Sequence, residues 1–465
     1  MHRTTAHALA PRVAPAAPPA ARPLRILFLA SAHNSLSQRV LVALTELGHR
    51  VVVEVVESGA AIEAAVARHR PQLIVCPMLK TIIPDGIWKR HRCLVVHPGP
   101  PGDRGPSSLD WAIELGAAEW GVTVLEATGE IDGGAVWAAR AFRTRAADKS
   151  SLYRHEVRRA AIEAVVEAVT AVAAGGRAPA PAAHRVTGRP RPLMRQPDRA
   201  IDWAADPTAT VVRRIRAAEG HPGVLDTVAG TEFHLFGAHR EDALRGTPGE
   251  IVAQRHGAVC RATVDGAVWT THLKRPGHYK LPAAQALALA GHELAVPEAP
   301  LPATGNTFRE IAYEERDGVG FLRFGFYNGA MSTDQCRRLL EAYREARTRD
   351  TRVIVLMGGA DFFSNGIHLN LIEAAEDPAA ASWWNLLAID DLVREVIETD
   401  ASSSSPRSPA TRPRAACRSR SPPTTCWRAR TSCSTPTTGT WAASTAPSTG
   451  PTCCRAVSGR TRPRG

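Results

Sequence analysis

The residues LRILFLASAHNSLSQRVLVALTELGHRVVVEVV (24–56) decide the fold of the first part of this chain. The opening apolar run, 24–30, is typical of a buried strand, and the polar residues behind it suit a turn and a helix cap. Residues 39–49 predict an amphipathic helix that ends at Gly48, and residues 49–56 predict a second strand. The stretch therefore predicts a strand–helix–strand unit of the kind that builds parallel sheets.

The alternation continues along the chain and brings one histidine to a strand end. Residues 61–69 predict a helix, and PQLIVCP (71–77) and RCLVVH (92–97) predict two further strands. This repeat implies a Rossmann-like parallel sheet with helices on both faces. Functional side chains in such sheets lie beyond the carboxyl ends of the strands. His97 is the last residue of its predicted strand, so we expect it at that edge.

Two loops organise the rest of this first domain, which we place at residues 24–185. A Gly/Pro-rich loop, PGPPGDRGPSS, occupies residues 98–108, and TGEIDGG occupies residues 128–134 between two strand candidates. A helix at residues 151–174 closes the domain. The Gly-, Pro- and Arg-rich residues 175–192 then indicate a linker.

Two segments of different patterning follow. Residues 200–296 contain one helix and then short strands broken by glycine, which predicts a small β-barrel. Residues 307–400 return to alternating strands and helices and predict part of another α/β domain. The predicted fold class is therefore α/β, with a Rossmann-like domain, a small β-barrel, a partial α/β domain and a disordered tail.

Both ends of the sequence have compositions that cannot bury a core. Residues 1–23 are rich in Ala and Pro and lack the apolar segment of a secretory signal, so we expect a disordered leader. Residues 401–465 contain eleven Arg but no Lys, Asp or Glu, and one Val but no Leu, Ile, Phe, Met or Tyr, so we expect a disordered tail. Without the tail the net charge of +12 falls to 12 − 11 = +1, which removes the electrostatic argument for a nucleic-acid partner.

Composition also bears on membranes, metals and location. No stretch is long and apolar enough to predict a transmembrane helix, so we expect a cytoplasmic protein with no membrane partner. None of the cysteines before the tail forms a CxxC motif with a partner motif, so we predict no metal site. We expect these cysteines to be reduced and buried: Cys76, Cys93, Cys260 and Cys336.

The segment around His97 resembles the formyltetrahydrofolate-dependent formyltransferases. The matching features, in order, are PQLIVCPMLKTIIPDGIWKRHRCLVVH (71–97), Arg104-Gly105, GVTV (121–124) and IDGG (131–134). The resemblance implies 10-formyltetrahydrofolate as the cosubstrate, with His97 and Asp132 as catalytic residues. It further implies a set of residues that bind the folate: Leu79, Ile82, Pro84, Arg104, Gly105, Ser107, Ser108 and Gly129.

The chemistry of formyl transfer gives both catalytic candidates a role. Attack of a nucleophile on the formyl carbon creates a tetrahedral oxyanion, which an imidazole donor stabilises in a dry site. A neighbouring carboxylate can orient the imidazole, accept the proton of the nucleophile or pass one to the leaving nitrogen. Taken without the surrounding pattern, His97 is also consistent with an ordinary strand-end polar residue, and Asp132 with a turn former before two glycines.

One position departs from the family pattern. The family usually has Asn two residues before the histidine, where this chain has Val95. Loss of one donor from an oxyanion site costs roughly 2.7–4 kcal/mol, so either another donor replaces it or the acceptor differs from the usual amine. The candidate donors are Arg104, Ser107 and Ser108. The alternative is that Arg104 pairs with a structural carboxylate and the two serines cap the next helix.

Residues outside this centre extend the resemblance. His33 and Asn34 follow the first strand and either face the site or cap a helix. RAIDWAADPTATVVRRIRAAEGHPG (199–223) resembles the entry to the β-barrel domain of methionyl-tRNA formyltransferase, where the barrel binds tRNA. The segment here has no concentrated basic stripe, which counts against a tRNA partner.

The third segment resembles the enoyl-CoA hydratase/isomerase (crotonase) family. The matching features are NGAMS (328–332), the strand VIVLMGG (353–359) and FSNGIH (363–368). The resemblance implies a coenzyme A thioester as ligand and the backbone N–H groups near Gly366 and Ile367 as half of an oxyanion hole. The other interpretation is an ordinary Gly-containing loop after a strand.

A formyltransferase half joined to a crotonase half resembles the HypX-type [NiFe]-hydrogenase maturation proteins. HPGPPGDRGPSSLDWAI (97–113) and FYNGAMST (326–333) resemble that family in particular. The resemblance implies formyl transfer from 10-formyltetrahydrofolate to coenzyme A, release of carbon monoxide by the crotonase half, and hydrogenase maturation factors as partners. Two alternatives stay open: formylation of an amine, as in methionyl-tRNA or a sugar nucleotide, and a scaffold without catalysis.

The composition of the tail has an explanation in the genetic code. TWAASTA (440–446), SCSTPTT (432–438) and STGPTCC (448–454) have codons that can give HMGGLYG, VVLNPYY and EYWTYLL in the neighbouring frame. These are crotonase-like stretches. We therefore predict a one-base frameshift near residues 400–406, which would leave the crotonase half incomplete and its lyase activity lost. A genuine Arg-rich disordered tail is the alternative.

Overall fold

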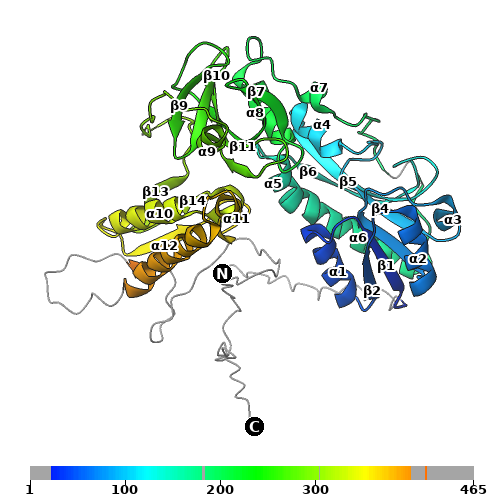
Figure 1. The fold of residues 1–465 in the computed structure, drawn as a ribbon. Helices are drawn as coiled ribbons and strands as arrows, with labels where there is room; N and C mark the ends of the chain where they lie inside the picture. The colour runs from blue at the N-terminus through cyan, green and yellow to red at the C-terminus, as the bar shows by residue number, and fades with distance from the viewer. Residues whose placement is uncertain (1–21, 181–183, 303, 400–413, 416–465) are drawn as a thin grey trace, which may run out of the picture. The chain divides into compact units, whose positions relative to one another are not determined.

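The chain folds as two units, Met1–Arg309 and Glu310–Gly465. The computed structural model describes residues 22–180, 184–302, 304–399 and 414–415 (Figure 1). The predicted leader therefore lies outside the described residues except for Arg22 and Pro23. The predicted tail and frameshift also lie outside them, except for the backbone of the short strand β18 (Arg414–Ala415).

A six-stranded sheet forms the centre of the first domain and has the strand order β2-β1-β3-β4-β5-β6. β1 to β4 pair in parallel, as the strand–helix–strand pattern predicts, whereas β5 is antiparallel to β4 and β6. β5 and β6 are joined directly by the loop 127–135, and a connection this short permits only antiparallel pairing. The strands are β1 (Arg25–Ala30), β2 (Arg50–Val55), β3 (Leu73–Met78), β4 (Cys93–His97), β5 (Glu119–Glu126) and β6 (Val136–Arg143).

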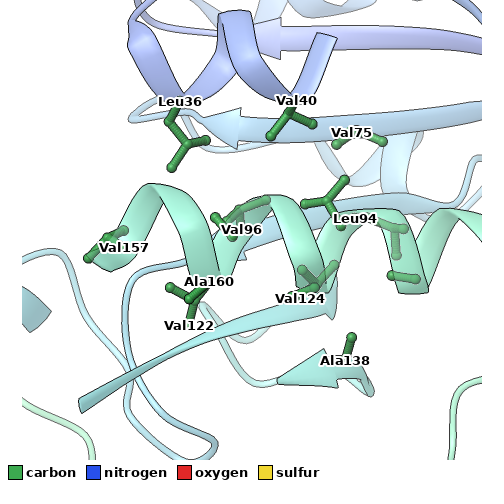
Figure 2. Close-up of a cluster of buried hydrophobic side chains, with 14 of the residues drawn as sticks. Leu36, Val40, Val75, Leu94, Val96, Val122, Val124, Ala138, Val157 and Ala160 are labelled. Atoms are coloured by element: carbon green, nitrogen blue, oxygen red, sulfur yellow. The ribbon is translucent and has the colours of Figure 1, made fainter. Parts of the chain in front are cut away.

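Helices cover both faces of this sheet, as predicted. Figure 2 shows one face, where side chains of α1 and of the η1–α6 helix meet those of the strands: Leu36, Val40, Val157, Ala160, Val75, Leu94, Val96, Val122, Val124 and Ala138. On the other face, α2 and α3 pack against the alternate residues Leu27 and Leu29 of β1. The helices are α1 (Ser35–Glu46), α2 (Gly59–His69), α3 (Asp85–Trp88), α4 (Ser108–Glu114), α5 (Lys149–Leu152), η1 (Tyr153–Val157), α6 (Arg158–Ala173) and α7 (Gln196–Arg199).

Helix α1 begins earlier than the apolar periodicity predicted, because Asn34 caps it. The Asn34 side chain accepts hydrogen bonds from the backbone N–H groups of Leu36 (3.1 Å) and Ser37 (3.0 Å). The predicted end at Gly48 agrees with the structure, where this glycine has φ +86° just after the last turn.

The second domain of the same unit is an open antiparallel sheet, so the predicted β-barrel needs correction. Its strands follow the order β7-β8-β11-β10-β9, with β12 added to β11. Within the described residues no pairing joins the end strands β7 and β9; the free edge of β9 instead forms an isolated parallel bridge between Gln254 and Glu298. The elements are α8 (Thr208–Ala217), β7 (Val224–Val228), β8 (Thr231–Glu241), β9 (Ile251–Arg255), β10 (Ala258–Ala262), β11 (Ala267–Lys274), β12 (Lys280–Pro282) and α9 (Ala283–Leu289).

The second unit begins with a hairpin and continues as a strand–helix–strand unit. β13 and β14 are antiparallel, β14 and β16 are parallel, and α10 connects the latter two. α10 and α12 pack with these strands around the buried residues Leu322, Tyr343 and Ile354. The elements are β13 (Ile311–Arg316), β14 (Val319–Phe324), η3 (Tyr327–Gly329), β15 (Ala330–Met331), α10 (Thr333–Ala346), β16 (Val353–Met357), β17 (Gly366–Ile367), α11 (Leu369–Glu373) and α12 (Pro378–Glu398).

Two expectations from composition meet the structure at this level. The thiols of Cys76, Cys93, Cys260 and Cys336 are all buried and unpaired, which confirms the predicted burial. Across the described part of the chain, none of the helices combines the length and the apolar character that a membrane crossing demands.

Candidate active site

His97 lies at the carboxyl end of β4, where the sequence placed it, and carboxylates approach both of its ring nitrogens. Nε2 is 2.8 Å from Asp103 Oδ2, and Nδ1 is 3.4 Å from Asp132 Oδ2. The imidazole is 4% exposed. In the antiparallel pair of β4 and β5, His97 stands opposite Thr123. The predicted pair of His97 and Asp132 is therefore brought together, and a second carboxylate joins it.

The second carboxylate, Asp103, was missed by the sequence reasoning. It lies in the loop 98–107, its side chain has no exposed surface, and its Oδ1 accepts a hydrogen bond from Arg191 Nη1 at 2.5 Å. A guanidinium beside a fully buried carboxylate offsets the cost of removing that charge from water. The position of Asp103, six residues after a strand-end histidine, was the one signal in the sequence that could have indicated it.

Asp132 occupies a turn that places its carboxylate toward the histidine. Its φ of 53° is in the left-handed region, which Asp adopts more readily than most residues. Asp132 Oδ2 also accepts a hydrogen bond from the backbone N–H of Gly105 at 3.1 Å. The side chain is 12% exposed, so of the two carboxylates on His97 it is the one within reach of a ligand.

Close packing on His97 explains the glycine that follows the strand. A Cβ atom at Gly99 would lie 2.3 Å from Asp103 Oδ2, 2.5 Å from His97 Nε2 and 2.7 Å from Ser108 Oγ. These separations are too short for any side chain other than hydrogen. The His97–Asp103 pair is thus enclosed by the backbone of the loop 98–107.

The predicted folate-binding residues divide into two groups. Arg104 forms an ion pair with Glu130, and Gly105 donates to Asp132, so the loop 98–107 is fastened to the loop 127–135. Gly129 faces the ring of Trp88 in α3, where a Cβ atom on the glycine would lie 3.6 Å from the ring, and this contact joins the same loop to the segment after β3. Of that segment, Leu79 packs on the apolar core, Pro84 precedes α3, and Ile82 is 74% exposed.

Ser107 and Ser108 form the second group, because both are buried and bonded within the protein. Ser107 Oγ accepts from the backbone N–H of Met194 at 3.0 Å, and Ser108 Oγ donates to the carbonyl of Pro98 at 2.9 Å. Both hydroxyls therefore form hydrogen bonds within the protein. His33 and Asn34 lie at the start of α1, where Asn34 caps the helix and also donates to Tyr153 Oη at 3.2 Å.

Residues 175–192 were expected to be a plain linker, and the structure corrects this for the part that follows residue 186. The N–H groups of Thr187 and Gly188 donate to the carbonyl of Pro101 at 3.1 and 3.0 Å, and the N–H of Arg191 donates to the carbonyl of Arg104 at 3.0 Å. This segment, 187–194, therefore lies along the loop 98–107 and delivers the guanidinium that holds Asp103. The Gly/Pro composition of this segment therefore reflects the close approach of its backbone to the loop 98–107 and not conformational flexibility.

In the second unit, Gly366 and Ile367 form the short strand β17, which pairs in parallel with Ala330 and Met331. The N–H of Gly366 donates to Ser364 Oγ at 3.0 Å. The proposed oxyanion donor at Gly366 is therefore bonded within its own loop in this structure.

Comparison with known proteins places this geometry in a family. The model named Formyl transferase matches residues 54–169, and Formyl transferase, C-terminal domain, matches residues 193–290. Hydrogenase maturation factor HoxX of Bradyrhizobium diazoefficiens is 51% identical over 382 residues, which are 81% of this chain and 66% of HoxX. A crystal structure of a HypX variant from Aquifex aeolicus is 46% identical with a TM-score of 0.76, over 81% of this chain and 70% of that one.

The chain belongs to the HypX/HoxX family of hydrogenase maturation factors. The predicted relation to the HypX-type proteins and the presence of both formyltransferase domains are confirmed. HypX from Aquifex aeolicus has also been crystallised in complex with tetrahydrofolic acid, and that structure matches 81% of this chain and 67% of its own, with a TM-score of 0.76.

The formyltransferase likeness extends beyond HypX. Methionyl-tRNA formyltransferase of Burkholderia pseudomallei is 29% identical over 300 residues, 61% of this chain and 87% of that enzyme. The chain spans about two thirds, 66%, of the length of HoxX.

Proposed function

We propose that this protein transfers a formyl group from 10-formyltetrahydrofolate to coenzyme A, as a step in supplying the carbon monoxide ligand of a [NiFe] hydrogenase. The observation that carries the proposal is His97, held between Asp103 and Asp132 at the carboxyl end of β4. Membership of the HypX family and the tetrahydrofolate complex of HypX support the folate as donor.

The residues around His97 fit a folate. The ligand combines a polar reacting centre with flat, apolar rings, and the loops 79–84 and 127–135 expose Ile82 (74%) and Ile131 (64%) close in sequence to the polar groups. Contact with the flat rings of a folate would remove the apolar surface of these isoleucines from water, which is favourable. Arg104 and the backbone of Gly105 border the same loop and supply polar contacts.

The cosubstrate supplies the formyl group on its N10 atom, and the protein supplies a donor and a base. Nδ1 of His97 can accept the proton of the attacking thiol, and the imidazolium so formed can donate to the oxygen of the formyl group as negative charge develops there. Asp132, the more exposed carboxylate, can stabilise this imidazolium and pass its proton to N10 as the carbon–nitrogen bond breaks.

A thiol acceptor is supported by the position two residues before the histidine. Val95 is half-buried and packs with the apolar cluster around Cys76 and Ile87, so its side chain offers no amide hydrogen bond to a ligand at His97. In this proposal formyl-coenzyme A is the substrate of a complete crotonase half, which would split it into carbon monoxide and coenzyme A. The crotonase-like unit of this chain, predicted to be incomplete, retains Gly366 and Ile367 in β17 as candidate oxyanion residues but is expected to lack that lyase activity.

Acceptor specificity is tested by incubating the full chain with 10-formyltetrahydrofolate and one of four additions: coenzyme A, initiator methionyl-tRNA, an amino-sugar nucleotide, or none. Release of tetrahydrofolate and the mass of the product are measured. Formyl-coenzyme A is the expected product. A formylated amine would move the assignment to an amine acceptor, and folate binding without turnover on any acceptor would make the protein a scaffold.

Two substitutions test the catalytic residues. His97→Ala and Asp132→Asn should each lower kcat by about 10²–10³, the usual cost of losing an oxyanion donor or a general base. Asn tolerates the left-handed backbone of position 132. The matched controls are His278→Ala, an exposed histidine, and Asp317→Asn, an exposed aspartate with the same φ of 53°. Full activity in either test variant would refute its assigned role.

A further inference from the structure

We propose that Asp103 is the positioning residue of the formyl-transfer site, and that Arg191 holds it so that Nδ1 of His97 faces the substrate. The inference rests on the proposed role of His97 and goes beyond it, because it assigns a function to two residues outside the predicted pair. It begins from the unequal contacts of the two ring nitrogens.

The contact to Asp103 is the stronger of the two. Nε2 and Asp103 Oδ2 are 2.8 Å apart, within ordinary hydrogen-bond range, whereas Nδ1 and Asp132 Oδ2 are 3.4 Å apart. Asp103 has no exposed surface, while Asp132 is 12% exposed. Because the Arg191 guanidinium donates to the other oxygen of this carboxylate, we assign Asp103 as the acceptor and Nε2–H of the imidazole as the donor. Nδ1 is then the nitrogen left for chemistry on the side of Asp132.

The Asp103 carboxylate cannot easily rotate away from His97, because its other oxygen also accepts a hydrogen bond. Oδ1 accepts from Arg191 Nη1 at 2.5 Å. The Arg191 guanidinium also lies 5.2 Å from the ring centroid of Trp120, whose indole N–H donates to the carbonyl of Pro98 at 3.0 Å. The guanidinium is therefore fixed on two sides, and the carboxylate between it and the imidazole has one orientation.

Backbone contacts around Arg191 fix its position relative to Asp103. The segment 187–194 donates backbone hydrogen bonds to the carbonyls of Pro101 and Arg104. In addition, Gly105 adopts a φ of +110° and lies so close to Arg191 that a Cβ atom on this glycine would be 2.2 Å from the carbonyl oxygen of Arg191. The segment 187–194 thus contacts the loop 98–107 at its backbone, and Arg191 reaches Asp103 from a fixed point. The chain of hydrogen bonds runs from Arg191 through Asp103 to His97, whose ring reaches the reacting centre.

Replacement of Asp103 by asparagine gives a specific expectation. The new amide side chain would present its oxygen to Arg191, which only donates, and its NH₂ group to His97. Nε2 would then have to accept a hydrogen bond, and the proton would move to Nδ1. Asp103→Asn should therefore invert the tautomer of the neutral ring while the side chain keeps its shape. Loss of the tautomer-fixing carboxylate in a catalytic His–Asp pair costs up to about 10⁴ in kcat.

The experiment combines kinetics with nitrogen NMR on the full chain labelled with ¹⁵N-histidine, with His97 assigned by its loss in His97→Ala. The wild type should show a protonated Nε2 and an unprotonated Nδ1 on His97, and Asp103→Asn should exchange the two signals. kcat for coenzyme A formylation should fall by about 10²–10⁴ with KM little changed. Arg191→Gln should lower kcat in the same direction, and Arg191→Lys should restore part of it. Arg189→Gln, an exposed neighbour in the same segment, is the matched control and should match the wild type.

The outcomes separate this inference from the proposed function. A wild-type protein that transfers no formyl group but shows the predicted Nε2–H would remove the function and retain the pairing. A protonated Nδ1 in the neutral wild-type ring, or an Asp103→Asn variant within about threefold of wild-type kcat, would overturn the inference. If Asp103→Asn does not fold, the wild-type spectrum and the Arg191 variants decide: equal kcat in Arg191→Gln and Arg189→Gln would overturn it as well.

Discussion

Substitution of Gly99 by alanine measures how tightly the His97–Asp103 pair is enclosed. The new methyl carbon would lie 2.3 Å from Asp103 Oδ2, 2.5 Å from His97 Nε2 and 2.7 Å from Ser108 Oγ. All three side chains are buried, so none of them can swing into solvent to make room. The methyl group must separate the imidazole from the carboxylate or lift the loop 98–107 from the end of β4.

The two costs of this change overlap. Inserting a methyl group into a packed interior typically costs about 1–3 kcal/mol, and a lost hydrogen bond to a charged group about 1.5–3 kcal/mol. Since relief of the clash is what breaks the hydrogen bond, we expect the unfolding free energy of the first unit to fall by about 2–3 kcal/mol. Displacement of His97 by about 1 Å should also lower formyl transfer by about 10²-fold.

The assay is urea unfolding followed by tryptophan fluorescence, with transfer rates measured at a temperature where both proteins are folded. Gly86→Ala is the control within the same unit, because a Cβ there would meet only the end of the flexible Arg90 side chain, at 3.4 Å. A Gly99→Ala protein with the wild-type midpoint would refute the packing argument. A destabilised protein with the wild-type rate would refute the role of the pair.

Three further predictions concern other parts of the molecule. Asp110 Oδ1 accepts hydrogen bonds from Arg199 Nη2 at 2.6 Å and from Lys149 Nζ at 3.0 Å. Asp110→Ala should therefore lower the free energy of unfolding in urea by about 3–5 kcal/mol, because it leaves a buried guanidinium unpaired. An unfolding midpoint equal to that of the wild type would contradict this. Burial raises the pKa of the Cys93 thiol to about 12. Iodoacetamide at pH 8 should therefore leave Cys93 unmodified, as measured by peptide mapping, until urea is added. Labelling of Cys93 in the folded protein would show that the thiol is accessible and would contradict the prediction. Ile82→Ser should change stability by no more than about 0.5 kcal/mol and should weaken tetrahydrofolate binding measured by calorimetry; unchanged affinity would remove Ile82 from the site.

The sequence predicts what depends on local patterns. Apolar runs and turn residues located the strands β1 to β4, and the rule that function lies at carboxyl ends placed His97 correctly. Asp132 could be found because its loop carries a recognisable IDGG motif and lies next to His97 through the pairing of β4 with β5. Asn34 was left between two interpretations, and the structure gives it the helix cap.

The rest depends on contacts between distant residues. Arg191 stands 88 positions from Asp103, and no periodicity connects a Gly/Pro-rich segment to a loop of similar composition. Asp103 itself follows two glycines and a pair of prolines, where an aspartate is ordinary turn chemistry. The sequence also could not show whether the second sheet closes into a barrel. Closure depends on whether the end strands β7 and β9 pair with each other, and the residue pattern within either strand does not determine this.

The segment 187–194 has a consequence for anyone who divides this protein into pieces. It leads from one formyltransferase domain into the next, yet its Arg191 completes the surroundings of His97 in the preceding one. A fragment cut at residue 185, where composition suggests a natural boundary, would lose this arginine and leave a buried carboxylate without its cation. The catalytic domain can be studied alone only if it retains the residues through Met194.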